Sequence, residues 1–83
     1  MTVQEEVVEA LVKKAAELFH KDPSTMGPET SFIDDLDAKS VNFVQFSAML
    51  EDMYDVEVPF MEFKRKKTFA DAGAYIASLL GCE

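Results

Sequence analysis

The chain has 83 residues and a formal net charge of −8, with 48% apolar residues, three glycines and three prolines. This composition indicates one packed domain over residues 1–83, and domains this small bury only about 60–65% of their unfolded surface, which excludes a large enclosed substrate pocket. The negative charge also argues against binding to nucleic acid, whose phosphates would be repelled.

Neither a signal peptide nor a membrane-spanning segment is expected. Residues 1–6 lack a basic region, and no apolar run is long enough to cross a bilayer. The single cysteine, Cys82, is expected to be an exposed tail thiol, and the single histidine, His20, leaves no plausible zinc ligand set. We therefore expect a cytoplasmic protein without membrane insertion.

An amphipathic helix is predicted from about Val3 to about His20, because apolar residues recur there at three- and four-residue spacings. Thr2 and Glu5 fit a capping box at its start. His20 is interpreted as a solvated residue at the end of the helix, without a catalytic role.

Residues 22–39 lack helical periodicity and contain the proline, glycine and serine residues that are typical of turns. A loop of this length is unusual in so small a domain. Its apolar residues must bury something, so we expect the loop to be pinned to the core and to hold Ser40 in a fixed place. These residues are Met26, Phe32, Ile33 and Leu36.

A second helix is predicted from about Ser40 to about Tyr54. Its broad apolar face comprises Phe43, Phe46, Ser47, Leu50, Met53 and Tyr54. A second apolar strip comprises Val41, Val44 and Ala48. Two interpretations of this strip remain open: burial in the core, and a partner-facing surface beside Ser40.

The remaining segments complete an all-α fold class, a small four-helix bundle with three main helices, one short helix and a long loop between the first and the second. Residues 55–59 form an extended connector that Pro59 closes. A short helix follows over residues 60–66, with Phe60 and Phe63 inward, and the basic residues 64–67 are most simply a solvated face. Thr68 and Asp71 cap the last helix, which Gly81 ends.

Ser40 follows the acidic run Asp34–Asp37 and precedes the second helix, and two roles fit it. A serine is a preferred N-cap, because its oxygen can accept a hydrogen bond from a free N–H of the first turn. Alternatively, its hydroxyl is a point of covalent attachment, where a phosphodiester would lie at the positive end of the helix dipole. On these residues alone the N-cap is the simpler interpretation.

Over nearly its whole length the chain resembles an acyl carrier protein. The resemblance rests on the order and spacing of Thr30-Ser31-Phe32, Asp34-Asp35-Leu36, Leu50-Glu51-Asp52-Met53-Tyr54, Val56-Glu57-Val58-Pro59, Thr68-Phe69-Ala70-Asp71-Ala72 and Tyr75-Ile76. It implies that Ser40 bears a 4′-phosphopantetheine arm, which a phosphopantetheinyl transferase attaches from coenzyme A. Acyl groups would then be carried as thioesters between acyl-loading and acyl-transfer enzymes, by a monomer that catalyses nothing itself. In this context attachment at Ser40 is favoured over simple capping.

The chain departs from the family pattern in its charges. Lys39 replaces the usual aspartate before the serine, and Asn42 and Gln45 stand where acidic residues normally follow. The basic residues 64–67 fall where the family's short helix is typically acidic. Reversed charge excludes common partners as well as selecting new ones, so we expect a specialised carrier for a dedicated fatty-acid, lipid or polyketide-type pathway. The expected partner-binding residues are Lys39, Val41, Val44, Gln45, Ala48, Glu51 and Asp52.

The resemblance also implies an acyl cavity between the helices, lined here by Phe43, Phe46, Ser47, Leu50 and Tyr54. Phe43 stands at its mouth, where a smaller residue is common. A phenyl ring there is expected to fill the space, so long straight acyl chains should be poorly sequestered.

Three other classes of protein fit the sequence less well. A calcium-binding EF-hand beginning at Asp35 fails, because Ser40 occupies the glycine position and Phe46 the position of the bidentate glutamate. Weak calcium or magnesium binding by the acidic loop remains open, although a solvated loop is the simpler account, and no metal site is expected. A hydrolytic enzyme is disfavoured, because no Ser-His-Asp or Cys-His arrangement can be assembled. The last alternative is an armless helical adaptor that keeps the carrier fold, which Lys39 makes conceivable and Ser40 argues against.

Overall fold

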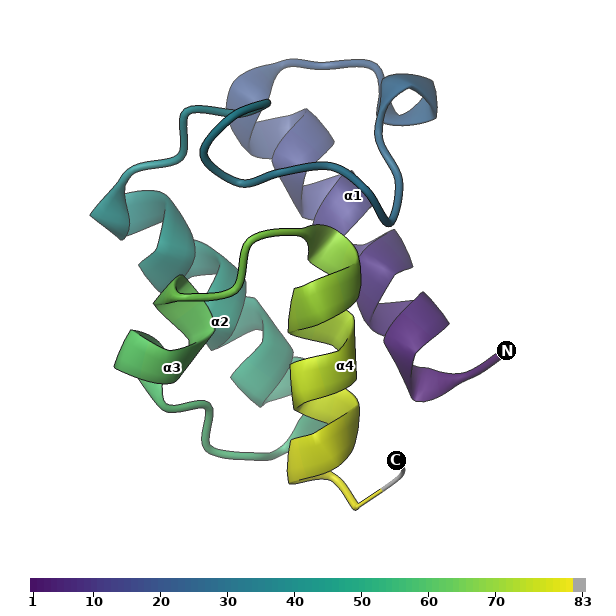
Figure 1. Ribbon diagram of the computed structural model, residues 1–83, viewed down its shortest axis with the longest axis vertical. Coiled ribbons are helices and arrows are strands. Elements are labelled where there is room, and N and C mark those ends of the chain that lie inside the picture. Colours follow the sequence, from purple (N-terminus) through teal and green to yellow (C-terminus); the bar gives the residue numbers. More distant parts are fainter. Residues whose placement is uncertain (82–83) are drawn as a thin grey trace.

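The computed structural model describes residues 1–81, which fold into four α-helices joined by connectors (Figure 1). The elements are α1 (Val3–Phe19), a short 3-10 helix η1 (Pro23–Thr25), α2 (Ser40–Tyr54), α3 (Phe60–Lys64) and α4 (Phe69–Leu79). The predicted all-α fold and the order of its helices are confirmed, although α3 ends two residues earlier than expected. Cys82, predicted to be an exposed thiol, lies outside the described residues.

Two capping boxes explain where α1 and α4 begin. The Thr2 N–H donates to the Glu5 carboxylate (2.8 Å), and the Glu5 N–H donates to the Thr2 hydroxyl (3.1 Å). Thr68 and Asp71 make the same reciprocal pair at 3.3 and 3.1 Å. Each pair satisfies backbone N–H groups that the helix itself leaves free, so both predicted boxes are confirmed.

The helix ends are set by residues that leave the right-handed helical conformation. His20 follows α1 with φ 56° and is exposed, as the sequence predicted. Gly81, with φ 75°, ends the last helical segment in the left-handed region that glycine adopts without steric cost. None of the helices in the described chain is both long and apolar enough to cross a membrane.

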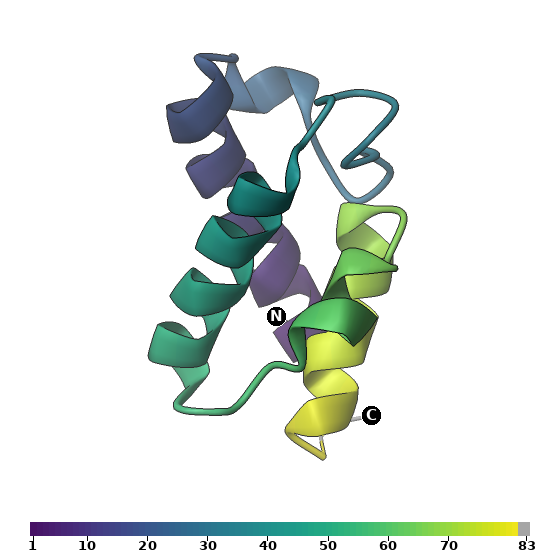
Figure 2. The same ribbon diagram turned by 90° about the vertical axis from the view of Figure 1, so that its left-hand side faces the viewer.

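α1 packs along α4, and α2 lies on the other side of the core with α3 against it, while residues 20–39 cross over one end of the bundle (Figures 1 and 2). The approach of α1 and α4 depends on a glycine. A Cβ at Gly73 would lie 2.8 Å from the carbonyl oxygen of Gln4. Any larger residue would push the two helices apart.

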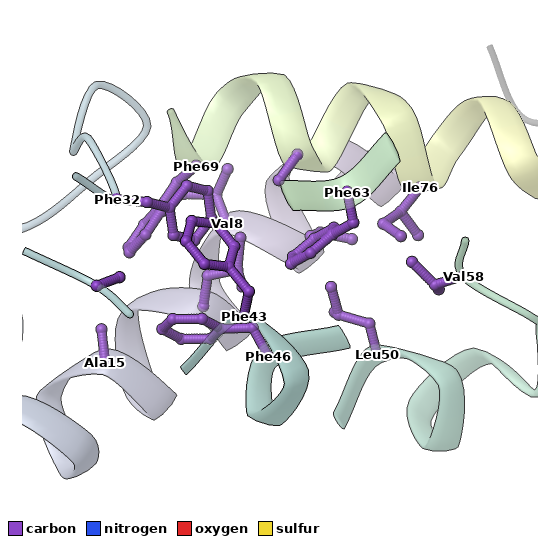
Figure 3. Packing of buried hydrophobic residues seen from close by; sticks show 14 of the residues in the cluster. Val8, Ala15, Phe32, Phe43, Phe46, Leu50, Val58, Phe63, Phe69 and Ile76 are labelled. Atoms are coloured by element: carbon purple, nitrogen blue, oxygen red, sulfur yellow. The ribbon is translucent and has the colours of Figure 1, made fainter. Parts of the chain in front are cut away.

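Five phenylalanine side chains dominate the core, and Phe32 lies at their centre (Figure 3). The centroid of its ring lies 5.1, 5.5, 6.0 and 5.0 Å from those of Phe43, Phe46, Phe63 and Phe69. These rings are tilted or edge-on to one another, the arrangements that their quadrupoles favour. One loop residue therefore contacts rings from α2, α3 and α4.

The long loop is pinned, as predicted. Phe32 and Leu36 are buried and Met26 is half-buried. The prediction that Ile33 is buried is wrong, because the turn that directs Phe32 inward directs the next side chain outward and leaves it 57% exposed. Met53, expected on the inner face of α2, is also exposed and lines an open groove against α1.

Candidate functional site

Ser40 is the first residue of α2 and is exposed, but it is not the N-cap. The N-cap is Lys39, whose carbonyl accepts from the N–H groups of Asn42 (2.9 Å) and Phe43 (3.2 Å). The Lys39 N–H donates to the side-chain oxygen of Asn42 (2.8 Å), so an amide three residues on supplies the cap. The N-cap interpretation of Ser40 is therefore wrong, and its hydroxyl is not needed to start the helix.

The loop backbone delivers Ser40 to this place. The Ala38 N–H donates to the carbonyl of Phe32 (2.9 Å), and the Ala38 side chain is buried. Asp37, the residue before Ala38, has φ 52°, a left-handed conformation that aspartate tolerates better than most residues. The segment immediately before Ser40 is thus tied to the centre of the aromatic core.

α3 brings a cation to the serine. The ammonium of Lys64 donates to the Ser40 hydroxyl oxygen at 3.1 Å, although the two residues are 24 positions apart in the chain. Of the basic residues 64–67, Lys64, Arg65 and Lys67 are exposed, as predicted, and Lys66 is half-buried. Arg65 lies 3.7 Å from the Glu62 carboxylate, and the Lys66 ammonium lies 4.7 Å from the centroid of the Tyr75 ring.

The first turn of α2 is electropositive. It contains no acidic residue, and the backbone N–H groups of Ser40 and Val41 find no hydrogen-bond acceptor within residues 1–81. Free N–H groups at a helix N-terminus, together with the helix dipole, favour an anion. Lys39 adds a second cation nearby, which pairs with Asp37 at 3.1 Å.

The second apolar strip of α2 faces solvent. Val41 is 61% exposed, Val44 is 50% exposed, and Ala48 is exposed as well. Burial of this strip in the core is therefore wrong, because Phe43, Phe46 and Leu50 already occupy the inward face of the same helix. The exposed strip begins directly beside Ser40.

The polar residues expected to contact partners differ in their exposure and in their hydrogen bonds. Lys39 and Asp52 are exposed, and Gln45 is exposed with its side-chain oxygen accepting from Asn42 (3.1 Å). Glu51 is half-buried, and its carboxylate accepts from the Val58 N–H (2.8 Å). Glu51 thus anchors the connector 55–59 to α2, a structural role that the sequence did not reveal.

The residues expected to line an acyl cavity are mostly close-packed. Phe43, Phe46 and Leu50 are at most 1% exposed, and the buried Ser47 hydroxyl donates to the Val44 carbonyl (3.1 Å). Tyr54 is half-buried at the far end of α2, where its hydroxyl donates to Glu6 of α1 (3.2 Å). Desolvation, with the Glu6 carboxylate, raises the pKa of Tyr54.

Two carboxylates of the acidic loop make local contacts. Asp35 accepts from the Ser31 N–H (2.7 Å), and Asp37 pairs with Lys39. Within residues 1–81 no three or more histidine, cysteine, aspartate or glutamate side chains gather in a way that could hold a metal ion.

Sequence reasoning missed two residues of this site. Asn42 supplies the cap of α2, and its spacing of three residues from Lys39 is a signal that could have revealed it. Lys64 was assigned to a solvated cluster, and no pattern in the sequence places it beside Ser40, because that contact depends on how α3 packs against α2.

The chain is similar to one protein family and to individual known proteins. A family model described as the phosphopantetheine attachment site matches residues 9–76. The meromycolate extension acyl carrier protein of Mycolicibacterium smegmatis is 37% identical over 76 residues, which cover 92% of this chain and 77% of that protein. The acyl carrier protein of Lactobacillus acidophilus is 36% identical over 78 residues, covering 94% of this chain and 98% of that protein.

The position of Ser40 predicts how its removal affects stability. Ser40→Ala should change the free energy of unfolding by no more than about 0.5 kcal/mol, since the hydroxyl caps nothing. Thr68→Ala, which removes a true N-cap hydroxyl, should cost about 0.5–2 kcal/mol. Urea unfolding followed by helical circular dichroism compares the two variants, and equal losses in both would contradict this assignment.

Proposed function

The chain belongs to the acyl carrier proteins, whose cofactor is 4′-phosphopantetheine, and from this premise we propose that Ser40 is the residue that carries the arm. The observation that carries the proposal is the exposed hydroxyl at the first residue of α2, which makes no capping bond. Near it lie the Lys64 ammonium and the N–H groups of Ser40 and Val41, which find no acceptor within the described chain. These donors fit a phosphodiester, because each favours a negatively charged oxygen.

The proposed attachment is a phosphoryl transfer by a phosphopantetheinyl transferase. The Ser40 oxygen forms the new bond to phosphorus, the pyrophosphate P–O bond of coenzyme A breaks, and adenosine 3′,5′-bisphosphate leaves. The hydroxyl proton passes to the transferase or to water. The thiol at the end of the arm then supplies the group that holds acyl cargo as a thioester.

This chain would contribute an anchor and a recognition surface, without catalysing a step. The anchor is rigid, because Ala38 just before Ser40 is buried and bonded to Phe32. The recognition surface would be the exposed side of α2 next to Ser40. We assign to it Lys39, Val41, Val44, Gln45, Ala48 and Asp52, with Glu51 shaping the adjoining connector.

We further propose that the partners are the loading and transfer enzymes of one dedicated lipid pathway. Similar proteins are named as meromycolate extension carriers, which are tied by name to a single lipid process. The first turn of α2 lacks acidic residues, and α3 is basic at its end. A surface of altered charge selects some partners by repelling others.

We also propose that residues 1–83 form one carrier domain that acts as a monomer in the cytoplasm. One buried cluster draws side chains from α1, α2, α3, α4 and the long loop. Weak, charge-steered encounters suit a carrier that must leave each enzyme after a transfer.

The first test is covalent loading. Incubation with coenzyme A, magnesium and a broad-specificity phosphopantetheinyl transferase should add the mass of one phosphopantetheine to the native chain and none to Ser40→Ala. Ser24→Ala is the matched control, because Ser24 is also exposed and also lies at the start of a helical turn. Intact-protein mass spectrometry reads the outcome.

Loading of Ser40→Ala would contradict the assignment of the site. A native chain that stays unmodified, while an ordinary acyl carrier protein is fully modified beside it, would favour the armless adaptor.

The packed core predicts where the cargo lies. On loading with a long straight acyl group, the amide chemical shifts of Phe46 and Leu50 should change little compared with loading by acetyl, because Phe43 fills the interior. Phe43→Leu leaves space that an apolar chain can enter, so the same shifts should then move. Large core shifts in the native chain would show that the bundle does sequester its cargo.

A further inference from the structure

Lys64 differs from Lys39, the other cation near Ser40, in its polar contacts. The chain has 16 acidic and only 8 basic residues, yet Lys64 has no carboxylate within ion-pair distance among residues 1–81. Its polar partner is the Ser40 hydroxyl oxygen at 3.1 Å. Lys39, the other nearby cation, is already paired with Asp37 at 3.1 Å. Lys64 is therefore the cation available to a new negative charge at Ser40.

The core fixes where α3, the helix that carries Lys64, lies. Phe63, next to Lys64, is fully buried, with its ring centroid 6.0 Å from that of Phe32 and 6.3 Å from that of Phe43. The Lys64 ammonium also lies 6.0 Å from the centroid of the Phe60 ring, at the outer limit of a cation–π contact. α3 therefore cannot move away from the start of α2 without disturbing buried aromatic rings.

Donors from two helices lie near the Ser40 hydroxyl. On the α2 side the N–H groups of Ser40 and Val41 have no acceptor within residues 1–81. On the α3 side lies the Lys64 ammonium, within hydrogen-bond distance of the oxygen that would bear the phosphorus. A helix N-terminus favours an anion, and an ammonium beside it strengthens that preference by a charge-assisted hydrogen bond.

We propose that Lys64 binds the phosphodiester of the attached arm and holds the base of the arm against α3. This inference rests on the proposed attachment at Ser40. The contact neutralises the negative charge that attachment adds, so a partner enzyme need not bring a cation to that phosphate.

The test uses the phosphopantetheinylated chain and two charge-matched variants. Lys64→Gln removes the proposed contact, whereas Lys67→Gln removes the same charge from an exposed residue that makes no side-chain contact to Ser40. A third variant, Lys64→Arg, restores the cation. All four proteins are first shown by intact mass to be fully modified, and their amide spectra without the arm establish that each is folded. The readouts are the ³¹P resonance of the phosphodiester and the side-chain ¹⁵N–¹H signals of the lysines.

Attachment of the arm should shift the Lys64 ammonium signal and slow its exchange with water, while the Lys67 signal stays unchanged. The ³¹P resonance should move in Lys64→Gln, stay in place in Lys67→Gln and return toward the native position in Lys64→Arg. Salt should weaken the effect, because an exposed contact of this kind is screened. Its loss should lower the population of the held arm about two- to five-fold.

An unchanged Lys64 signal on attachment, or identical ³¹P resonances in Lys64→Gln and Lys67→Gln, would overturn the inference while leaving Ser40 as the attachment site. Failure of all four proteins to gain the arm is a separate result, which counts against the proposed function itself.

Discussion

The packing of Phe32 is the constraint on which the rest of the structure depends. Its ring contacts aromatic rings from three helices, although the residue belongs to a loop. Its backbone is bonded on both sides, since its N–H donates to Lys67 (3.1 Å) and its carbonyl accepts from Ala38 (2.9 Å). One residue therefore links the segment before Ser40 to the connector between α3 and α4. Without it, the serine end of α2 and the Lys64 end of α3 would lose their common support.

The Ser40 hydroxyl takes no part in capping the helix that this support holds in place. A serine at the start of a helix usually serves as its cap, but here Lys39 and Asn42 provide the cap. The Ser40 hydroxyl stays exposed beside N–H groups that find no acceptor among residues 1–81. A carrier needs a fixed anchor for a mobile arm. Ser40, the proposed anchor, directly follows a loop segment that is bonded to the core, and the exposed apolar strip of α2 begins beside it.

The helices could be predicted from sequence because their signals are local. Thr2 with Glu5 and Thr68 with Asp71 fixed two helix starts, and the apolar spacing defined the inward faces. Features that depend on packing could not be predicted. The exposure of Ile33 and Met53 follows from the turn after Phe32 and from the gap between α1 and α2. The contact of Lys64 with Ser40 joins two helices 24 residues apart, and neither local pattern contains it.

Native-state hydrogen exchange at the Ala38 amide tests most directly whether the core holds the serine end of α2. The Ala38 N–H donates to the Phe32 carbonyl. The amide of Ile33, the residue after Phe32, finds no acceptor within residues 1–81 and serves as an internal reference. We predict that the Ala38 amide exchanges as slowly as the core amides of α2, such as Leu50, because its hydrogen bond opens only when the core does. Exchange at Ala38 as fast as at Ile33 would contradict it, and would mean that Ser40 stands on a segment that the core does not hold.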